Sequence, residues 1–314
     1  MGVLVALYAI LIFPGLAFLS TFGLVAEYVD RKLYARFQNR MGPPWFQPFA
    51  DFVKLLGKET IIPAEANATV FKVLPAVAMA AVVTAMFYIP VWDNRSLLGF
   101  EGDLIVVIYL LTIPTLTFFL AGWASTSLYA AMGAVRSLTQ LFAYEVPLYM
   151  ALLAPALLAR TWSLQTMARW YTEHPAWMLA NLLGFLVAIV ALQGKLEKVP
   201  FDIPEAETEI VGGTFTEYSG RLLAVFRMAI DMEMVVGAAL LAAVFLPFGL
   251  GLHPVLVFVL FLAKVLFLVA LAALLRALFA RLRIEQMVDF CWRILMPAAL
   301  LQLLLTVVLS GVAP

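Results

Sequence analysis

Acidic residues gather in one stretch of an otherwise apolar chain, between Val199 and Met234. Five of the protein's 20 acidic residues lie in its first part, namely Asp202, Glu205, Glu207, Glu209 and Glu217. Keeping carboxylates near lipid costs free energy, so such a cluster at the mouth of a membrane helix is typical of an ion or proton path, or of a docking surface.

Helix capping is an alternative explanation for part of this cluster. Asp202-Ile203-Pro204-Glu205 fits a helix start, with Asp202 as the N-cap and Glu205 at the capping-box position. Capping does not account for Glu207, Glu209 and Glu217. We therefore predict that the acids of this stretch take part in proton or ion coupling.

Further charges lie inside apolar segments. Arg227 and Asp231 are spaced to form a structural ion pair on one helix face, which leaves Glu233 off that face and unpaired. Glu145 and Lys264 lie within two other apolar stretches. Burial favours the neutral form of a carboxyl or an amine, so such groups can bind and release protons near neutral pH. We predict coupling roles for Glu145, Asp231, Glu233 and Lys264.

Composition defines the class of protein. Hydrophobic residues make up 64% of the chain, charged residues 13%, and the mean hydropathy is +1.00, which is typical of an integral membrane protein. The formal net charge is zero, so no basic field favours nucleic acid. Cys291 is the single cysteine and cannot by itself hold a cluster or a zinc ion. We predict no metal site and no redox cofactor in this chain.

Eight apolar stretches are each long enough to cross about 30 Å of hydrocarbon. They are residues 3–26, 71–92, 104–128, 138–160, 177–194, 225–248, 254–278 and 294–312. They lack the alternation of a membrane barrel, and no internal repeat divides the chain. We predict an all-α, polytopic membrane helix bundle in a single domain, residues 1–314.

The loop after the first stretch contains an amphipathic segment. Phe49, Phe52, Val53 and Leu56 follow helical spacing between Gln47 and Lys58. We predict an interfacial helix, and its simplest role is a brace at the membrane surface.

Basic residues predict the orientation of the bundle. The odd loops carry Arg31, Lys32, Arg36, Arg40, Lys54, Lys58, Arg136, Lys195, Lys198, Arg221, Arg276, Arg281, Arg283 and Arg293, whereas the even loops carry Arg95, Arg160 and Arg169. By the positive-inside rule, both termini face outward and the odd loops form one cytoplasmic platform. We predict that Arg36, Arg40, Arg281 and Arg283 dock a partner there.

At these residues the chain resembles the membrane subunit that docks the peripheral arm in respiratory complex I, the subunit 1 or H family. The resemblance is carried by Glu27-Tyr-Val-Asp-Arg31-Lys32, Arg36-Phe-Gln-Asn-Arg40-Met-Gly42-Pro43, Gln47-Pro48 through Lys58-Glu59, Tyr144-Glu145-Val146, Pro200-Phe201-Asp202-Ile203-Pro204-Glu205-Ala206-Glu207, Thr216-Glu217-Tyr218-Ser219-Gly220, Lys264, and Arg281-Leu-Arg283-Ile-Glu285-Gln286 with Trp292-Arg293 and Pro297.

Departures from the complex I pattern favour one branch. Gly42-Pro43-Pro44-Trp45-Phe46-Gln47-Pro48 closes a gap that complex I members usually fill with a longer insert. This short loop, together with Glu207-Thr-Glu-Ile-Val-Gly-Gly213, looks closer to the membrane anchor of group 4 energy-converting nickel-iron hydrogenases and related ferredoxin-linked complexes. The alternative is a complex I-type subunit that forms part of a quinone site.

The resemblance implies a division of labour in a prokaryotic cell membrane. Peripheral partners would carry iron-sulfur clusters and a nickel-iron or quinone-reducing centre, antiporter-like membrane subunits would move protons or sodium ions, and this chain would couple the two. A stand-alone ion channel or secondary transporter is a further alternative, which the missing inverted repeat disfavours.

Overall fold

The structure is a computed structural model that describes residues 3–311, apart from the side chains of Glu207 and Thr208. The predicted role of Glu207 therefore lies outside the described residues. Its helices are α1 (Val3–Leu11), α2 (Leu16–Phe37), α3 (Gln47–Gly57), α4 (Ala68–Met86), α5 (Asp103–Ala124), α6 (Leu128–Ala159), α7 (Leu164–Glu173), η1 (Pro175–Asn181), α8 (Leu182–Lys195), α9 (Glu207–Ile210), η2 (Gly213–Phe215), α10 (Gly220–Phe245), α11 (Pro254–Leu278), α12 (Ile284–Phe290), the π turn η3 (Cys291–Leu295) and α13 (Met296–Ser310).

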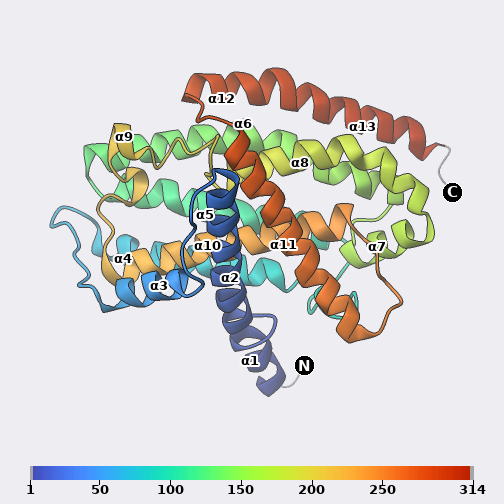
Figure 1. The fold of residues 1–314 in the computed structure, drawn as a ribbon, viewed down its shortest axis with the longest axis horizontal. Coiled ribbons are helices and arrows are strands. Elements are labelled where there is room, and N and C mark those ends of the chain that lie inside the picture. Colours follow the sequence, from blue (N-terminus) through green and yellow to red (C-terminus); the bar gives the residue numbers. More distant parts are fainter. Residues whose placement is uncertain (1–2, 312–314) are drawn as a thin grey trace.

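The predicted helix bundle is confirmed. Within residues 3–311, eight helical segments are long and apolar enough to cross a membrane, and no strand is present (Figure 1). Each of the eight apolar stretches in the sequence corresponds to one of these segments. A continuous apolar run in lipid has the lowest free energy as a helix, because all of its backbone hydrogen bonds then lie within the segment.

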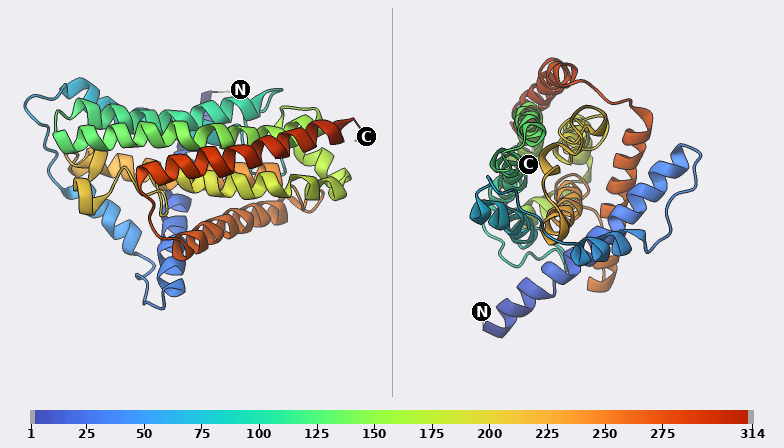
Figure 2. Two further views of the ribbon diagram at one scale, coloured as in Figure 1. Left: turned by 90° about the horizontal axis from the view of Figure 1, so that it is seen from above. Right: turned by 90° about the vertical axis from the view of Figure 1, so that its left-hand side faces the viewer.

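Helix α10 lies in the centre of the bundle. It packs against α2, α4 and α11, and most of its residues are buried. On the other side of the molecule α6 packs against α5, α8 and α13, which run side by side in Figure 2. Helices α1 and α2 project from the bundle toward the N-terminus (Figures 1 and 2). The long packed helices leave a cleft where α2 and α10 meet the segment that follows α8.

Helix ends differ from the predicted spans where charged residues continue a helix. The first apolar stretch ends at residue 26, but α2 continues to Phe37 and carries Arg31, Lys32 and Arg36, which the sequence placed in a loop. Arginine, lysine, leucine and alanine are good helix formers, so loss of hydropathy does not end the helix. It ends instead before Asn39, which has a left-handed φ of 56°.

The segment predicted as an interfacial helix is helical. Helix α3 packs against α2 and α10 through Phe49 and Phe52. Val53 and Leu56, the other members of the predicted apolar stripe, are exposed. Half of the apolar stripe therefore packs on the bundle and half faces outward. The position of α3 in the membrane interface stays a prediction.

The fifth loop, residues 196–219, does not begin a helix at Asp202, so the predicted N-cap is wrong. Phe201 and Ile203 are buried on either side of Asp202 and hold the chain in turns. The short helix α9 begins at Glu207, with Ala206 as its N-cap residue. Burial of two large side chains outweighs the local capping signal.

A close backbone contact fixes this loop on α6. A Cβ atom on Gly133 would lie 2.5 Å from the backbone nitrogen of Thr214, a distance that no side chain tolerates. Glycine at this position of α6 lets the loop backbone lie directly against the helix. The acid-rich segment is thereby held over the helix bundle.

Candidate functional site

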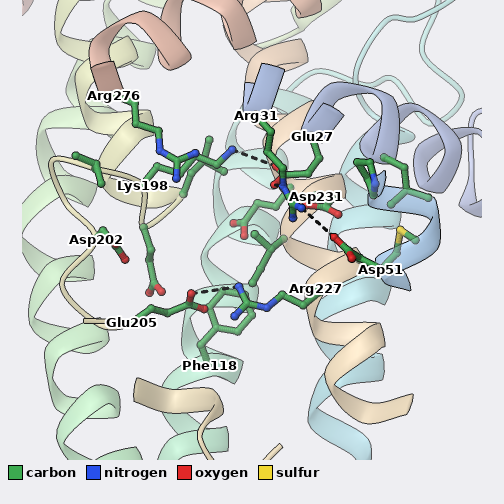
Figure 3. Close-up of a pocket in the computed structure, with 18 of the residues that line it drawn as sticks. Glu27, Arg31, Asp51, Phe118, Lys198, Asp202, Glu205, Arg227, Asp231 and Arg276 are labelled. Atoms are coloured by element: carbon green, nitrogen blue, oxygen red, sulfur yellow. Dashed lines mark hydrogen bonds and ion pairs between the residues drawn. The ribbon is translucent and has the colours of Figure 1, made fainter. Parts of the chain in front are cut away.

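A charged cavity of about 550 Å³ lies between α2, α3, α10, α11 and the fifth loop (Figure 3). Its charged lining consists of Glu27, Asp51, Glu197, Asp202, Glu205, Asp231, Glu233, Arg31, Lys195, Lys198, Arg227, Arg276 and Arg281. Acids and bases of nearly equal number thus face one space. In Figure 3, Asp202 and Glu205 come from the fifth-loop side, and Asp51 and Asp231 lie across from them.

Asp30 anchors one wall of the cavity. Its side chain is fully buried, and its Oδ2 atom lies 2.8 Å from Lys198 Nζ and 3.0 Å from Arg276 Nη1. Lys198 Nζ also lies 3.4 Å from Glu27 Oε2. Burial alone lowers the pKa of Lys198, but Asp30 and Glu27 together raise it above its ordinary value. This network ties α2, the fifth loop and α11 together.

Glu27 also binds a second cation. Arg31 Nε lies 2.6 Å from Glu27 Oε1, and Arg31 Nη1 lies 3.1 Å from Asp51 Oδ2 on α3 (Figure 3). Arg31 therefore bridges α2 and α3. Through Glu27 the bridge is continuous with the Asp30 network.

The prediction that Glu233 is unpaired is wrong. Glu233 Oε1 lies 2.8 Å from Lys195 Nζ, and both side chains are buried, with 2% and 5% of their surfaces exposed. Lys195 also donates a hydrogen bond to the backbone carbonyl of Leu111 on α5. The sequence assigned Lys195 to a loop, whereas it is the last residue of α8. This buried pair links α8 to α10 in the lining of the cavity.

The predicted pair of Arg227 with Asp231 is also wrong, because among the described residues Arg227 contacts a different acid. Arg227 Nη1 lies 3.1 Å from Glu205 Oε2, and its guanidinium lies 5.5 Å from the centre of the Phe215 ring. The fifth loop folds back over α10 and brings Glu205 to Arg227. Asp231 lines the charged cavity on the side of Arg31 and Asp51 (Figure 3).

Glu197 is a cavity residue that sequence reasoning missed. Its Oε1 accepts a hydrogen bond from Ser137 Oγ at 2.7 Å. Burial, reinforced by Glu205, Glu233 and Asp202, raises the pKa of Glu197 to about 8, although the Ser137 hydrogen bond opposes the shift. Asp30, Lys195 and Lys198 were missed as well. The available signal was the charged run Lys195-Leu-Glu197-Lys198 at the end of an apolar stretch.

Glu145 lines a second, smaller cavity. Its Oε1 accepts hydrogen bonds from Thr112 Oγ1, at 2.8 Å, and from the Tyr149 hydroxyl. This second cavity has a volume of about 20 Å³ and is otherwise lined mainly by apolar side chains of α5, α6, α8 and α10. Lys195 lines both cavities. The charged cavity and the cavity of Glu145 therefore share one buried lysine in their linings.

Lys264 and Glu217 lie outside this arrangement. Lys264 Nζ donates a hydrogen bond to the backbone carbonyl of Phe248 and lies 4.2 Å from the centre of the Phe248 ring. It lines a pocket that shares no lining residue with the charged cavity. Glu217 is half-buried and, among the described residues, forms no ion pair with Arg221. The structure does not bring either residue to the other predicted coupling residues.

Glu209 and the predicted docking arginines lie nearer the surface. Glu209 is exposed, 2.6 Å from Arg136 Nη1 and 3.7 Å from Arg281 Nη2, and the hydrogen bond from Arg136 lowers its pKa. Arg36, Arg40 and Arg283 are exposed. Arg281 is half-buried and also lines the charged cavity. Three of the four arginines are therefore free to contact a partner, and the fourth joins the surface to the cavity.

Among the described residues, no group of three or more His, Cys, Asp or Glu side chains is placed to hold a metal ion. The cavity's acids are instead interleaved with lysine and arginine side chains, as the ion pairs above show.

The eight apolar helical segments within residues 3–311, with a charged cavity between α2, α3, α10, α11 and the fifth loop, define a polytopic membrane protein. The family model described as NADH dehydrogenase matches residues 9–307. The chain therefore belongs to the NADH dehydrogenase subunit 1/H family.

Relatives from bacteria match nearly the whole chain. NADH-quinone oxidoreductase subunit 8 of Thermus thermophilus is 36% identical over 318 residues, which covers 96% of this chain and 86% of that protein. The H subunit of the NADH-quinone oxidoreductase of Brevibacillus brevis is 36% identical over 304 residues and covers 93% and 90% of the two chains.

A solved structure has the same fold. It is a chain in the structure of the membrane-bound sulfane sulfur reductase, an archaeal respiratory membrane complex, with a TM-score of 0.87 and 28% identity over 97% of this chain and 100% of that one. The protein is therefore a membrane subunit of a complex I-like respiratory complex, and so a subunit of an oxidoreductase complex. This membership disfavours a stand-alone channel or transporter.

Proposed function

We propose that this chain couples electron transfer in peripheral subunits to ion movement in neighbouring membrane subunits, as in the group 4 hydrogenase-like branch. One observation carries the proposal. A cavity lined by charged side chains shares the buried Lys195, the partner of Glu233, with the smaller cavity that Glu145 lines inside a membrane helix. Charged groups inside a membrane protein are costly, and their usual use is an ion or proton path.

The coupling follows from electrostatics inside the bundle. A change of charge or protonation in the cavity alters the balance between Lys195 and Glu233, because ion pairs in a low-dielectric interior respond strongly to added charge. Lys195 also lines the space that contains Glu145. A shift of this lysine would change the electrostatic potential in the cavity that Glu145 of α6 lines. Asp231, Glu205 and Asp202 would set the charge of the cavity.

The docking face would carry Arg36, Arg40, Arg281 and Arg283, with both termini on the other side of the membrane. The peripheral partners would supply iron-sulfur clusters and the catalytic centre, since the described residues offer no metal site. Antiporter-like membrane subunits would carry the moving ions. In this arrangement the chain contributes no redox centre and acts as the link between the two arms.

A quinone site is the second candidate. The cavity volume of about 550 Å³ is within the range of small-molecule pockets. Its strongly charged lining is less suited to an apolar ring than to charge transfer. The test is inhibition of turnover by a lipophilic quinone analogue. Inhibition of the wild-type complex that disappears when the wall residue Phe52 is changed to Trp would favour this candidate over the first.

The test of coupling uses Glu145→Gln in the assembled complex, reconstituted in proteoliposomes. The variant keeps the shape of the side chain and removes its charge, so we expect electron transfer and assembly to persist while ion uptake per electron falls by about tenfold or more. Glu173→Gln, an exposed acid on α7, is the matched control. Ion uptake equal to that of the control would remove Glu145 from the path, and unchanged uptake in Glu233→Gln as well would end the coupling proposal.

A further inference from the structure

Glu197 occupies an unusual place in the wall of the charged cavity. It lies two residues after the end of α8 and has a left-handed φ of 49°, which non-glycine residues rarely adopt. This conformation is held by a hydrogen bond from its backbone N–H to the carbonyl of Gly194. Such strained positions persist where the surrounding structure fixes them, and they concentrate at functional sites.

The lysines beside Glu197 in sequence are both bound to other acids. Lys195 pairs with Glu233, and Lys198 pairs with Asp30. Among the described residues, Glu197 has no ion-pair partner, and its hydrogen-bond partner is the Ser137 hydroxyl on α6. It is therefore a cavity carboxyl without a cation, although the cavity holds six lysines and arginines.

Groups on several elements face this carboxyl. They are Glu233 on α10, Tyr144 on α6, Lys195 at the end of α8, and Asp202 and Glu205 on the fifth loop. The cations among its surroundings are already engaged, since Lys195 binds Glu233 and Arg227 binds Glu205. The carboxyl thus faces an excess of negative charge, which favours its protonated form.

We propose that Glu197 is the carboxyl that binds and releases a proton in the cavity wall beside the Lys195–Glu233 pair. The inference rests on the proposed coupling function and assigns one of its steps to a residue. The step is the reaction of the Glu197 carboxylate with one proton from the cavity to give the carboxylic acid. No electron is transferred and no other bond forms or breaks.

The position explains how this proton would be coupled to the rest of the path. When Glu197 is ionised, its negative charge repels Glu233, the carboxylate that pairs with Lys195. When Glu197 is protonated, this repulsion is absent. Proton binding at Glu197 would therefore set the strength of the buried pair that leads toward Glu145. Burial, which raises the pKa of Glu197 to about 8, makes this change accessible near neutral pH.

The test compares the whole complex carrying Glu197→Gln, Glu197→Asp or the control Glu173→Gln. Infrared difference spectra between about pH 6 and about pH 9 report protonated carboxyl groups, and proteoliposomes report ion uptake per electron over the same range. We expect the wild-type and control complexes to lose a carboxylic acid signal with a midpoint near 8. Glu197→Gln should lack this signal, lower ion uptake by about tenfold, and flatten the pH profile. Glu197→Asp should restore a titrating signal and part of the uptake.

The inference would be overturned if Glu197→Gln took up ions at the wild-type level with an unchanged pH profile. It would also be overturned if the carboxyl signal persisted in this variant. If that variant does not assemble, Ser137→Ala takes its place. It removes a hydrogen bond that favours the charged form, so the midpoint should rise, and an unchanged midpoint would contradict the assignment. If Glu197→Gln behaves like the wild type while Glu145→Gln loses ion uptake, this inference alone is rejected. If both variants take up ions normally, the coupling function is rejected as well.

Discussion

Individual buried charges hold the cavity of this protein in shape. Asp30 has no exposed surface, and its Oδ2 atom contacts both Lys198 and Arg276. These two contacts join residues that are 168 and 246 positions apart in the chain. A buried ion that loses its counter-charge costs several kcal/mol, so one carboxylate here stabilises two cations at once.

Replacing Asp30 with Asn tests this role. The variant leaves the half-buried Lys198 and Arg276 without their shared, fully buried counter-charge, and we expect the free energy of unfolding to fall by about 3 kcal/mol. Thermal unfolding of the purified complex measures the loss. Asp289→Asn is the control, because Asp289 forms an exposed pair with Arg293 and such pairs contribute about 0–1 kcal/mol. Equal stability of the two variants would show that the Asp30 network is not structural.

At the scale of elements, the acid-rich fifth loop depends on close packing against α6 and α10. Arg136 on α6 lies 2.6 Å from Glu209, and Arg227 on α10 lies 3.1 Å from Glu205. Gly133 brings the loop backbone against α6. The loop therefore has fixed positions for its acids without a long helix of its own, and α9 spans only Glu207–Ile210.

Gly133→Ala should displace this loop. Alanine is the better helix former, but its Cβ would lie 2.5 Å from Thr214, so we expect a net loss of about 1–3 kcal/mol in stability and a drop in ion uptake per electron. Gly57→Ala is the matched control, since a Cβ on Gly57 meets nothing within 4 Å. Unfolding temperature and ion uptake measured on both variants separate the steric effect from helix propensity. A stabilised, fully coupled Gly133→Ala would contradict the packing argument.

At the scale of the whole molecule, the polar interior of the bundle is a cavity that α2, α3, α10, α11 and the fifth loop enclose. The arginines proposed for docking belong to the last turn of α2 and to the segments that follow α2 and α11, and the C-terminal ends of these two helices lie close together (Figure 1). Apolar side chains remain exposed along α1, α11 and α13. These faces are suited to lipid or to the neighbouring membrane subunits of the complex.

Topology is the prediction that belongs to this scale. The excess of lysine and arginine in the odd loops predicts that reporter fusions after Asp51 and after Arg281 read as cytoplasmic. Fusions after Arg95 and after Glu173 should read as external. The measurement is the activity of a compartment-specific reporter in intact cells. The opposite pattern would overturn both the orientation and the proposed docking face.

Local properties of the sequence determined the class of fold. The length of each apolar run predicted the eight spans, because crossing hydrocarbon requires about 20 apolar residues whatever their neighbours are. Helical spacing likewise predicted α3, and the resemblance predicted the family. The placement of Glu145 within a membrane-length helix was also predictable, since its flanking residues are apolar. Each of these features depends on residues that are close together in the chain.

Pairing of charges was decided only by the tertiary structure. Glu233 was predicted to be unpaired, yet Lys195 reaches it from another helix, and Arg227 takes Glu205 in preference to Asp231 on its own helix. Asp202 is not a helix cap, because burial of Phe201 and Ile203 shapes the turn around it. An ionised side chain in a bundle pairs with whichever opposite charge the packing of helices brings within about 4 Å, and sequence spacing does not encode that distance between separate helices.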